Sequence, residues 1–388
     1  MENILICTGH ELLYRDIIKA ENCTLYDSRG NRYLDLESGI WCTSVGHSHP
    51  RITNTIREQS GKIIHTGFCY LNPNVENAAT KLLRITGLNK GKCIFLCSGS
   101  EAVELAVKIT QSISEQPFIL TMKDSYLSAF GSAGSKSKDH WILFDWMSNE
   151  KMDSIPFEKI SAFIFEPGSS GGLVRFPPMD LIEEIVNKIR ANNGIIIANE
   201  VTTGMGRTGE WFGYNHYDLV PDIIAIGKGL GNGYPVSCTV LSQTILQKLT
   251  LNKFYYSQSH QNDPLGAAIA SEVISIIEDH NLIMSSKVKG EEIKTRLNII
   301  KEQYGIVKEI RGRGLMIAVE FEKNGNLSYA EKINLELLKR KIILVRKPGS
   351  EVIRIDPCLT IEKQEIDYFL NSMEEIISKI AEQTSKTK

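Results

Sequence analysis

Seven short apolar runs between residues 93 and 241 place the strongest constraint on how this chain folds. They are CIFLC (93–97), FILTM (118–122), WILF (141–144), AFIFE (162–166), GIIIA (194–198), DIIAI (222–226) and VSCTVL (236–241). Longer amphipathic stretches separate them, as in residues 181–194, where apolar side chains recur at helical spacing. Short apolar strands that alternate with helices are typical of an α/β fold. We therefore predict a mostly parallel seven-stranded sheet with helices on both faces.

The rest of the chain predicts a smaller α+β domain. Two long helical stretches (264–279 and 285–304) precede short strands around 315–322 and 342–355 and a final helix over 362–381. The segment TLYDSRGNRYLDLESG (24–39) reads as strand, turn and strand, and we expect it to join this smaller domain. The expected division is an N-terminal segment (1–47), a large domain (48–270) and a small C-terminal domain (271–388).

Composition and charge narrow the classes of partner. Hydrophobic residues make up 42% of the 388 positions, and the formal net charge is −2, which gives no electrostatic attraction for nucleic acid or an anionic membrane. No apolar run reaches the ~18–20 residues that span a bilayer, and the N-terminus does not resemble a signal peptide. The cysteines and histidines lack metal-ligand spacing. We expect a cytoplasmic protein that acts on small molecules, without a metal site.

Lys228 follows the sixth apolar run and lies between two glycines, in the sequence DIIAIGKGLGNGYP. In open α/β sheets, ligands bind beyond the carboxyl ends of the strands, so residues at this place are candidates for a site. A nucleophilic amine must be unprotonated, which requires its pKa to fall from about 10.4 toward neutrality, and burial lowers the pKa of a lysine. The alternative is a solvated surface lysine that happens to follow a strand.

Polar or flat side chains follow four other apolar runs. Ser98 and Glu101 have capping-box spacing for a helix start, and Gly99 between them lets a ligand approach the backbone, because free amides at a helix start bind phosphate. The others are Tyr126, Glu166 at the head of EPGSSGG, Asn199, and Val201 two residues further on. An ordinary capped helix and ordinary core packing are the alternatives for individual members. Together with Lys228, these residues form a series in which each member follows a strand. This series predicts a single site.

The segment NEVTTGMGRTGEWFGYNHYDLVPDIIAIGKGLGNGYP resembles the class III aminotransferase signature DEVxTGxGRTG…PDI…KGLGxGxP. The resemblance extends over nearly the whole chain. It implies the aspartate-aminotransferase-like fold (fold type I) and pyridoxal 5'-phosphate as cofactor, with Lys228 forming the Schiff base with that cofactor.

The resemblance also assigns roles to other residues. Ser98, Gly99 and Ser100 form the phosphate loop, Tyr126 and Val201 face the two sides of the ring, and Glu166 and Thr202 lie near it. Ser259 falls where the family has a threonine that reaches the phosphate of the neighbouring subunit, which implies a homodimer with active sites at the subunit interface. Arg354 resembles the arginine that binds a substrate carboxylate, and Trp41 is expected in the pocket wall, with plain core packing as its alternative.

Departures from the family pattern concern the chemistry directly. Asn199 replaces the aspartate that pairs with the pyridine nitrogen, and an amide does not supply the charge that keeps this nitrogen protonated. Thr202 stands where many members have glutamine or histidine. Residues 127–129 replace the usual His-Gly-Arg, so an arginine for a second carboxylate is missing, and EPGSSGG lacks the glutamate that some members have after its first glycine.

We expect an aminotransferase that moves an amino group from an amine or amino acid to a 2-oxo acid, pyruvate or 2-oxoglutarate. A racemase or epimerase on the same fold remains open, since proton return from the opposite face inverts the substrate. A weakly active cofactor-binding protein, impaired by Asn199, is the third possibility. The three differ in their products: an oxo acid, an inverted substrate, or neither.

Overall fold

The central sheet of the computed structural model, which describes residues 3–5, 12–67, 69–148, 152–168, 171–324 and 327–385, has seven strands. Their order is β4 (Lys92–Leu96), β10 (Ser237–Leu241), β9 (Ile223–Ile226), β8 (Ile195–Asn199), β7 (Ile160–Phe165), β5 (Phe118–Met122) and β6 (Trp141–Phe144). Strand β10 is antiparallel to both of its neighbours, and all other pairs are parallel. The predicted α/β class and the mostly parallel seven-stranded sheet are confirmed.

Side chains alternate between the two faces of this sheet, and helices cover both. Phe163 and Ile196 pack into one apolar cluster, whereas Ile164 and Ile197, the next residues along the same strands, pack into the other. The large part contains α2 (Pro50–Ser60), α3 (Pro73–Thr86), α4 (Gly99–Ile113), α5 (Gly131–Ser135), α6 (Met179–Ala191), α7 (Gln243–Asn252) and α8 (Pro264–Asp279). Its 3-10 helices are η1 (Met152–Ser154), η2 (Phe157–Lys159), η3 (Gly213–Tyr217) and η4 (Lys228–Gly231).

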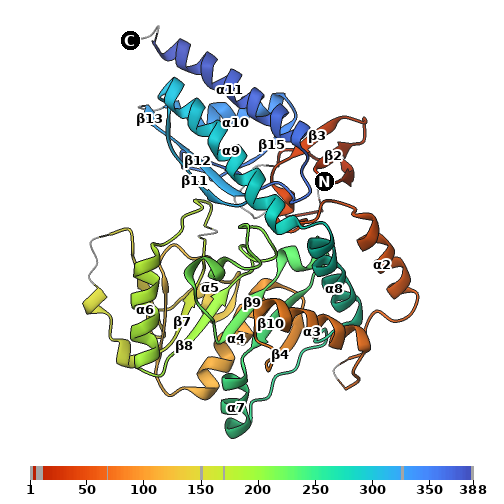
Figure 1. Ribbon diagram of the computed structural model, residues 1–388, viewed down its shortest axis with the longest axis vertical. Coiled ribbons are helices and arrows are strands. Elements are labelled where there is room, and N and C mark those ends of the chain that lie inside the picture. Colours follow the sequence, from red (N-terminus) through yellow and green to blue (C-terminus); the bar gives the residue numbers. More distant parts are fainter. Residues whose placement is uncertain are drawn as a thin grey trace.

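The C-terminal part builds a second, antiparallel sheet above the first (Figure 1). Its strand order is β11 (Val307–Arg313), β12 (Met316–Phe321), β17 (Val352–Ile355) and β16 (Val345–Arg346). The helices of this part are α9 (Leu282–Tyr304), α10 (Tyr329–Lys339) and α11 (Lys363–Ser385), and a short hairpin joins β13 (Lys323–Asn324) to β14 (Leu327–Ser328). Strand β17 carries Arg354, which lies against Trp41 of the N-terminal segment.

The N-terminal strands share a sheet with a C-terminal strand. This sheet runs β1 (Ile17–Glu21), β2 (Thr24–Asp27), β3 (Arg32–Asp35) and β15 (Ile342–Ile343), with β3 and β15 parallel. In Figure 1 the red strands accordingly lie beside the blue half of the molecule. Helix α8 runs without interruption across residue 270, so we propose its end as the boundary between the two domains. Within the described residues, no helix combines the length and apolar character needed to cross a bilayer.

Candidate active site

Lys228 begins η4, two residues after β9 ends, and adopts a left-handed backbone with φ of 42°. Its Nζ donates a hydrogen bond to Thr202 Oγ1 at 3.3 Å and lies 5.1 Å from the centroid of the Trp41 ring. Burial lowers the pKa of Lys228, whereas the nearby Cys42 and Glu166 act in the opposite direction. The net direction favours the neutral amine, which is the form that acts as a nucleophile or a proton acceptor.

The segment that carries Trp41 is strained. Helix α1 (Ser38–Trp41) has positive φ at every residue, between 46° and 64°, and three of these residues are not glycine. Such conformations cost on the order of 1–3 kcal/mol each and persist only where the surroundings hold them. Ser38 Oγ, buried, donates to Asp356 O at 2.7 Å and holds the segment to the C-terminal part. Trp41 is only 3% exposed.

The start of α4 is a capped helix that leaves backbone amides facing the site. The Ser98 hydroxyl accepts from Glu101 N at 3.3 Å, and Glu101 Oε2 accepts from Ser98 N at 2.6 Å, so the predicted capping box is present. This use leaves the backbone of Gly99 and Ser100, rather than the Ser98 side chain, to meet an anion. The Ser100 hydroxyl accepts from Ala129 N at 3.0 Å and keeps its own proton for a further partner.

Gly99, Val201 and Gly227 meet where the ends of three elements converge. A Cβ added to Gly99 would lie 2.5 Å from Val201 Cγ1, and a Cβ added to Gly227 would lie 3.1 Å from the Gly99 Cα. Real side chains at these glycines would therefore collide with their neighbours. The close approach joins the start of α4 to the strand end that carries Lys228, and it leaves a cradle of backbone amides with Val201 beside it.

Asn199, at the end of β8, is 2% exposed and uses its amide twice. Its Nδ2 donates to Tyr126 O at 3.3 Å, and its Oδ1 accepts from Val201 N at 3.3 Å. Glu166, also buried, accepts from Tyr126 N at 3.1 Å, so the backbone of Tyr126 is held from both sides. The Tyr126 side chain itself is half exposed and does not belong to the core.

Arg354 projects from β17 toward Trp41 and is 5% exposed. Its guanidinium carbon lies 3.9 Å from the centroid of the Trp41 ring, within range of a strong cation–π contact. Its Nε is 3.2 Å from Oδ2 of Asp356, which is 1% exposed. Because Lys228 Nζ approaches the same indole, Arg354 and Lys228 belong to one site.

The sequence profile described as Aminotransferase class-III matches residues 6–140 and 135–377. The chain belongs to this family. Acetylornithine aminotransferase of Methanocaldococcus jannaschii is 29% identical over 385 residues, which cover 94% of each chain. An uncharacterized aminotransferase of Schizosaccharomyces pombe is 27% identical over 93% of this chain and 90% of its own. A transaminase structure from the marine bacterium Virgibacillus is 26% identical over 95% of this chain and 94% of its own, with a TM-score of 0.87.

Class III aminotransferases depend on pyridoxal phosphate, and this chain is a pyridoxal-phosphate-dependent aminotransferase. The residues of the site fit that cofactor. The cradle at Gly99 tolerates no Cβ, the adjacent helix start offers free amides to a phosphate, and a partly buried lysine of lowered pKa lies at the end of a neighbouring strand. A solved relative, ornithine aminotransferase of Toxoplasma gondii, is described with partial occupancy of the cofactor at its active site.

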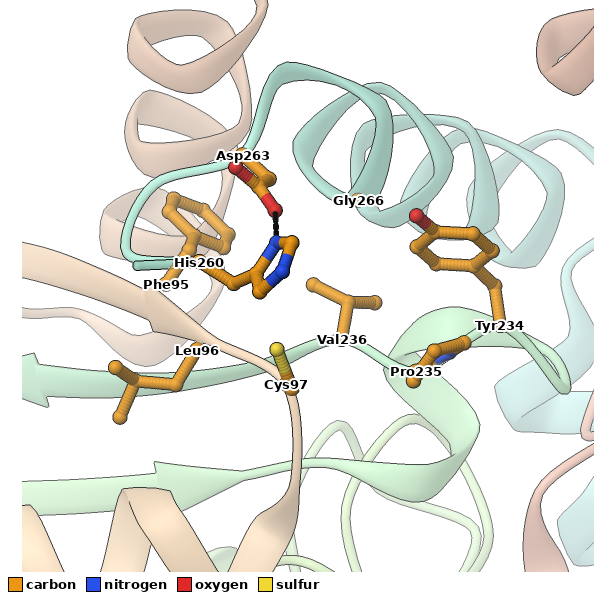
Figure 2. A pocket seen from close by; sticks show the side chains of 9 residues that line it. All are labelled: Phe95, Leu96, Cys97, Tyr234, Pro235, Val236, His260, Asp263 and Gly266. Carbon is orange, nitrogen blue, oxygen red and sulfur yellow. Dashed lines mark hydrogen bonds and ion pairs between the residues drawn. The ribbon is translucent and has the colours of Figure 1, made fainter. Parts of the chain in front are cut away.

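Ser259 lies outside this group, in an exposed turn between α7 and α8. The structure records no contact between it and Lys228. Next to it in the chain, His260 Nδ1 pairs with Asp263 Oδ2 at 2.6 Å, and Figure 2 shows this pair at the edge of a pocket of about 200 Å³. Asp263 also binds His65 at 2.5 Å. The two imidazoles therefore share one carboxylate.

The site also contains charged residues that the sequence reading did not single out. Asp356 accompanies Arg354, and Arg207 lies buried nearby, with hydrogen bonds to the carbonyl oxygens of Leu315 and Pro357. A signal for Asp356 existed, since residues two apart in a strand point to the same side and an acidic residue follows Arg354 at that spacing. In EPGSSGG, residues 169–170 lie outside the described residues, whereas Glu166 is described.

Proposed function

We propose that this aminotransferase moves an amino group from an amine or amino acid to pyruvate or 2-oxoglutarate, with Lys228 as its catalytic residue. The single observation that carries the assignment is a partly buried lysine at a strand end, whose pKa is lowered by burial and whose Nζ donates a hydrogen bond to Thr202 at 3.3 Å. A neutral amine held in this way would take a proton from the donor's reacting carbon and pass it to the cofactor carbon that receives the amino group, and would do the reverse with the 2-oxo acid. Thr202 keeps Nζ in place between these two events.

Other residues of the cradle position the cofactor in this proposal. The backbone amides of Gly99 and Ser100 bind the phosphate, Val201 packs on one side of the ring and Tyr126 covers the other. When bound, pyridoxal phosphate supplies an electron-accepting ring conjugated to the reacting carbon. Glu166 acts one step further away, because it holds the backbone of Tyr126 rather than a substrate.

Substrate carboxylates bind to Arg354, in our proposal, because a guanidinium presents two parallel donors to a carboxylate. Its position near the indole of Trp41, with Lys228 Nζ near the same ring, supports this role. The curated relatives named acetylornithine aminotransferase make N-acetylornithine the first donor to test.

The working unit in this proposal is a cytoplasmic homodimer in which Ser259 of one subunit reaches the phosphate bound by the other. Exposed apolar side chains on two loops that meet through His65 and Asp263 support an interface there. These side chains are Ile63, Ile64, Tyr70, Leu71 and Tyr255, and the last three are more than 70% exposed.

The test is a product analysis of the purified protein with added pyridoxal phosphate. N-acetylornithine, a set of simple amines and a set of amino acids are each incubated with pyruvate or 2-oxoglutarate. We expect alanine or glutamate to form in step with loss of the donor's amino group, and no transfer by a Lys228→Ala variant. Inversion of an amino acid without any oxo acid, or no reaction with any pair, would contradict the proposal.

A further inference from the structure

Arg354 raises a problem for the proposed function, on which this inference rests. An aminotransferase uses one pocket for two substrates, and the 2-oxo acid always carries a carboxylate whereas an amine donor carries none. A buried guanidinium that faces an uncharged group pays a large desolvation cost without compensation. Burial indeed lowers the pKa of Arg354, while Asp356 and Glu37 counteract this effect. The pocket therefore needs a counter-charge whenever the donor brings none.

Asp356 is placed to provide that charge. Burial raises the pKa of its carboxyl, and the guanidinium groups of Arg354 and Arg207 act in the opposite direction. Its Oδ2 is 3.2 Å from Arg354 Nε, and neither carboxylate oxygen accepts a hydrogen bond of good geometry from the described residues. The backbone of Asp356 is fixed on both sides, since its N donates to Leu36 O at 2.8 Å and its O accepts from Ser38 Oγ at 2.7 Å. A carboxylate pinned in this way stays beside the guanidinium whichever substrate is bound.

The other end of the guanidinium remains open to a ligand. Nε of Arg354 is buried and makes no hydrogen bond of good geometry. Among the described residues, the two terminal nitrogens of Arg354 have no hydrogen-bond partner. These nitrogens are the pair that a carboxylate meets end-on. Because Asp356 lies on the Nε side, a substrate carboxylate is able to occupy the terminal side without displacing it. The guanidinium is thus shared between a permanent and an exchangeable carboxylate.

We propose that Asp356 is the internal counter-ion of Arg354 and lets one pocket accept both a donor without a carboxylate and a 2-oxo acid with one. With an amine bound, Asp356 is the nearer of the two carboxylates, with Glu37, that balance Arg354. With an oxo acid bound, the substrate carboxylate takes the terminal nitrogens, and the nearby negative charge keeps this contact weak enough to exchange. Asp356 is a specificity-determining residue in this scheme, and it acts on substrates through Arg354.

Asp356→Asn in the holoenzyme tests the proposal, because it removes the charge and keeps the shape. The donors are 2-aminobutanoate and propan-1-amine, which differ only by the α-carboxylate, and butanoate is the carboxylate probe. We expect kcat/KM for propan-1-amine to fall at least tenfold, since Arg354 is then unbalanced. We expect the Kd of butanoate, measured by calorimetry, to fall at least tenfold as well. The same variant thus lowers the activity toward the amine and raises the affinity for the carboxylate.

Asp35→Asn is the matched control, because it neutralises a buried carboxylate that pairs with His47 at 2.7 Å instead of Arg354. This variant should change kcat/KM for propan-1-amine and the affinity for butanoate in the same direction. Asp356→Ser removes the same charge if the Asn variant does not fold. The proposal would be overturned if the Asp356 variants lost both activity toward propan-1-amine and affinity for butanoate, or if the butanoate Kd did not change. Absence of transfer by the parent would overturn the proposed function instead, while the butanoate Kd still decides the role of Asp356.

Discussion

At the residue scale, we propose that the Asn199 amide sets the electronic character of the bound cofactor. The protein uses both ends of the side chain, with Nδ2 donating to the Tyr126 carbonyl and Oδ1 accepting from Val201 N. An amide nitrogen has a second proton that is free to meet a ring nitrogen as a donor. A ring nitrogen that accepts a hydrogen bond is unprotonated, and an unprotonated ring withdraws electrons less strongly. Asn199 and its environment are therefore consistent with a restrained electron sink.

Asn199→Asp should make the bound ring a stronger electron acceptor. A carboxylate supports a protonated ring nitrogen by a charge-assisted hydrogen bond, stronger by on the order of 1–2 kcal/mol than a neutral one. With cofactor labelled with 15N in the ring, we expect the nitrogen resonance to move from the unprotonated to the protonated range, and single-turnover conversion of the donor to accelerate.

The same substitution carries a cost elsewhere, since aspartate has no N–H for the Tyr126 carbonyl. We expect the free energy of unfolding of the cofactor-free protein to fall by about 1 kcal/mol, measured by urea denaturation. A labelled nitrogen that stays unprotonated, or a donor half-reaction no faster than in the parent, would show that Asn199 does not control the ring.

At the scale of elements, the site depends on how closely the start of α4 approaches the ends of β8 and β9. Gly99→Ala tests this, because its Cβ would lie 2.5 Å from Val201 Cγ1. Overpacking of this kind typically costs about 1–3 kcal/mol of unfolding free energy. We expect that loss in urea denaturation, together with at least a tenfold weaker affinity for pyridoxal phosphate in a fluorescence titration.

Val201→Ala is the matched second change, since it removes the two methyl groups with which the new Cβ collides. In the double variant the loss of stability should be smaller than the sum of the two single losses, because the residues share one contact. Strictly additive losses would mean that the cradle does not depend on this approach.

The elements differ in how far the sequence predicts them. The seven strands of the central sheet lie at the seven apolar runs, because a strand covered on both faces needs a continuous apolar stretch. Strand β11 was not predicted, since its sequence VKEIRGR has only two apolar side chains and no regular alternation of buried and exposed residues. Contacts between side chains of different domains could not be predicted from local sequence patterns either. The pairing of Arg354 with Trp41 joins residues over 300 positions apart, which no local pattern reports.

At the scale of the whole molecule, the expected homodimer explains why Ser259 is exposed in the single chain. Ser259 and the apolar Tyr255 lie on a surface loop of the single chain, although the resemblance assigns Ser259 a place at the cofactor phosphate. A second copy of the chain resolves this if each site takes Lys228 from one subunit and Ser259 from the other. The predicted site is then only partly contained in one chain.

Mixed dimers test this arrangement. Lys228→Ala and Ser259→Asp are each expected to be nearly inactive as homodimers, the second because its carboxylate repels the phosphate. In a mixed dimer, Lys228 of the Ser259→Asp subunit meets the unchanged Ser259 of the other, so one site is intact. Random reassociation of equal amounts should then restore about a quarter of the parent's activity. Activity that stays at the mean of the two homodimers would contradict a shared site.

The central claim is that Lys228 bonds to the cofactor and carries the proton. Borohydride reduction of the holoenzyme followed by peptide mapping is the most direct measurement, because it fixes the cofactor to the lysine that holds it. We predict one pyridoxyl group per chain, on the peptide that contains Lys228, and none after Lys228→Ala. A pyridoxyl group on any other lysine, or undiminished labelling in the variant, would contradict the account.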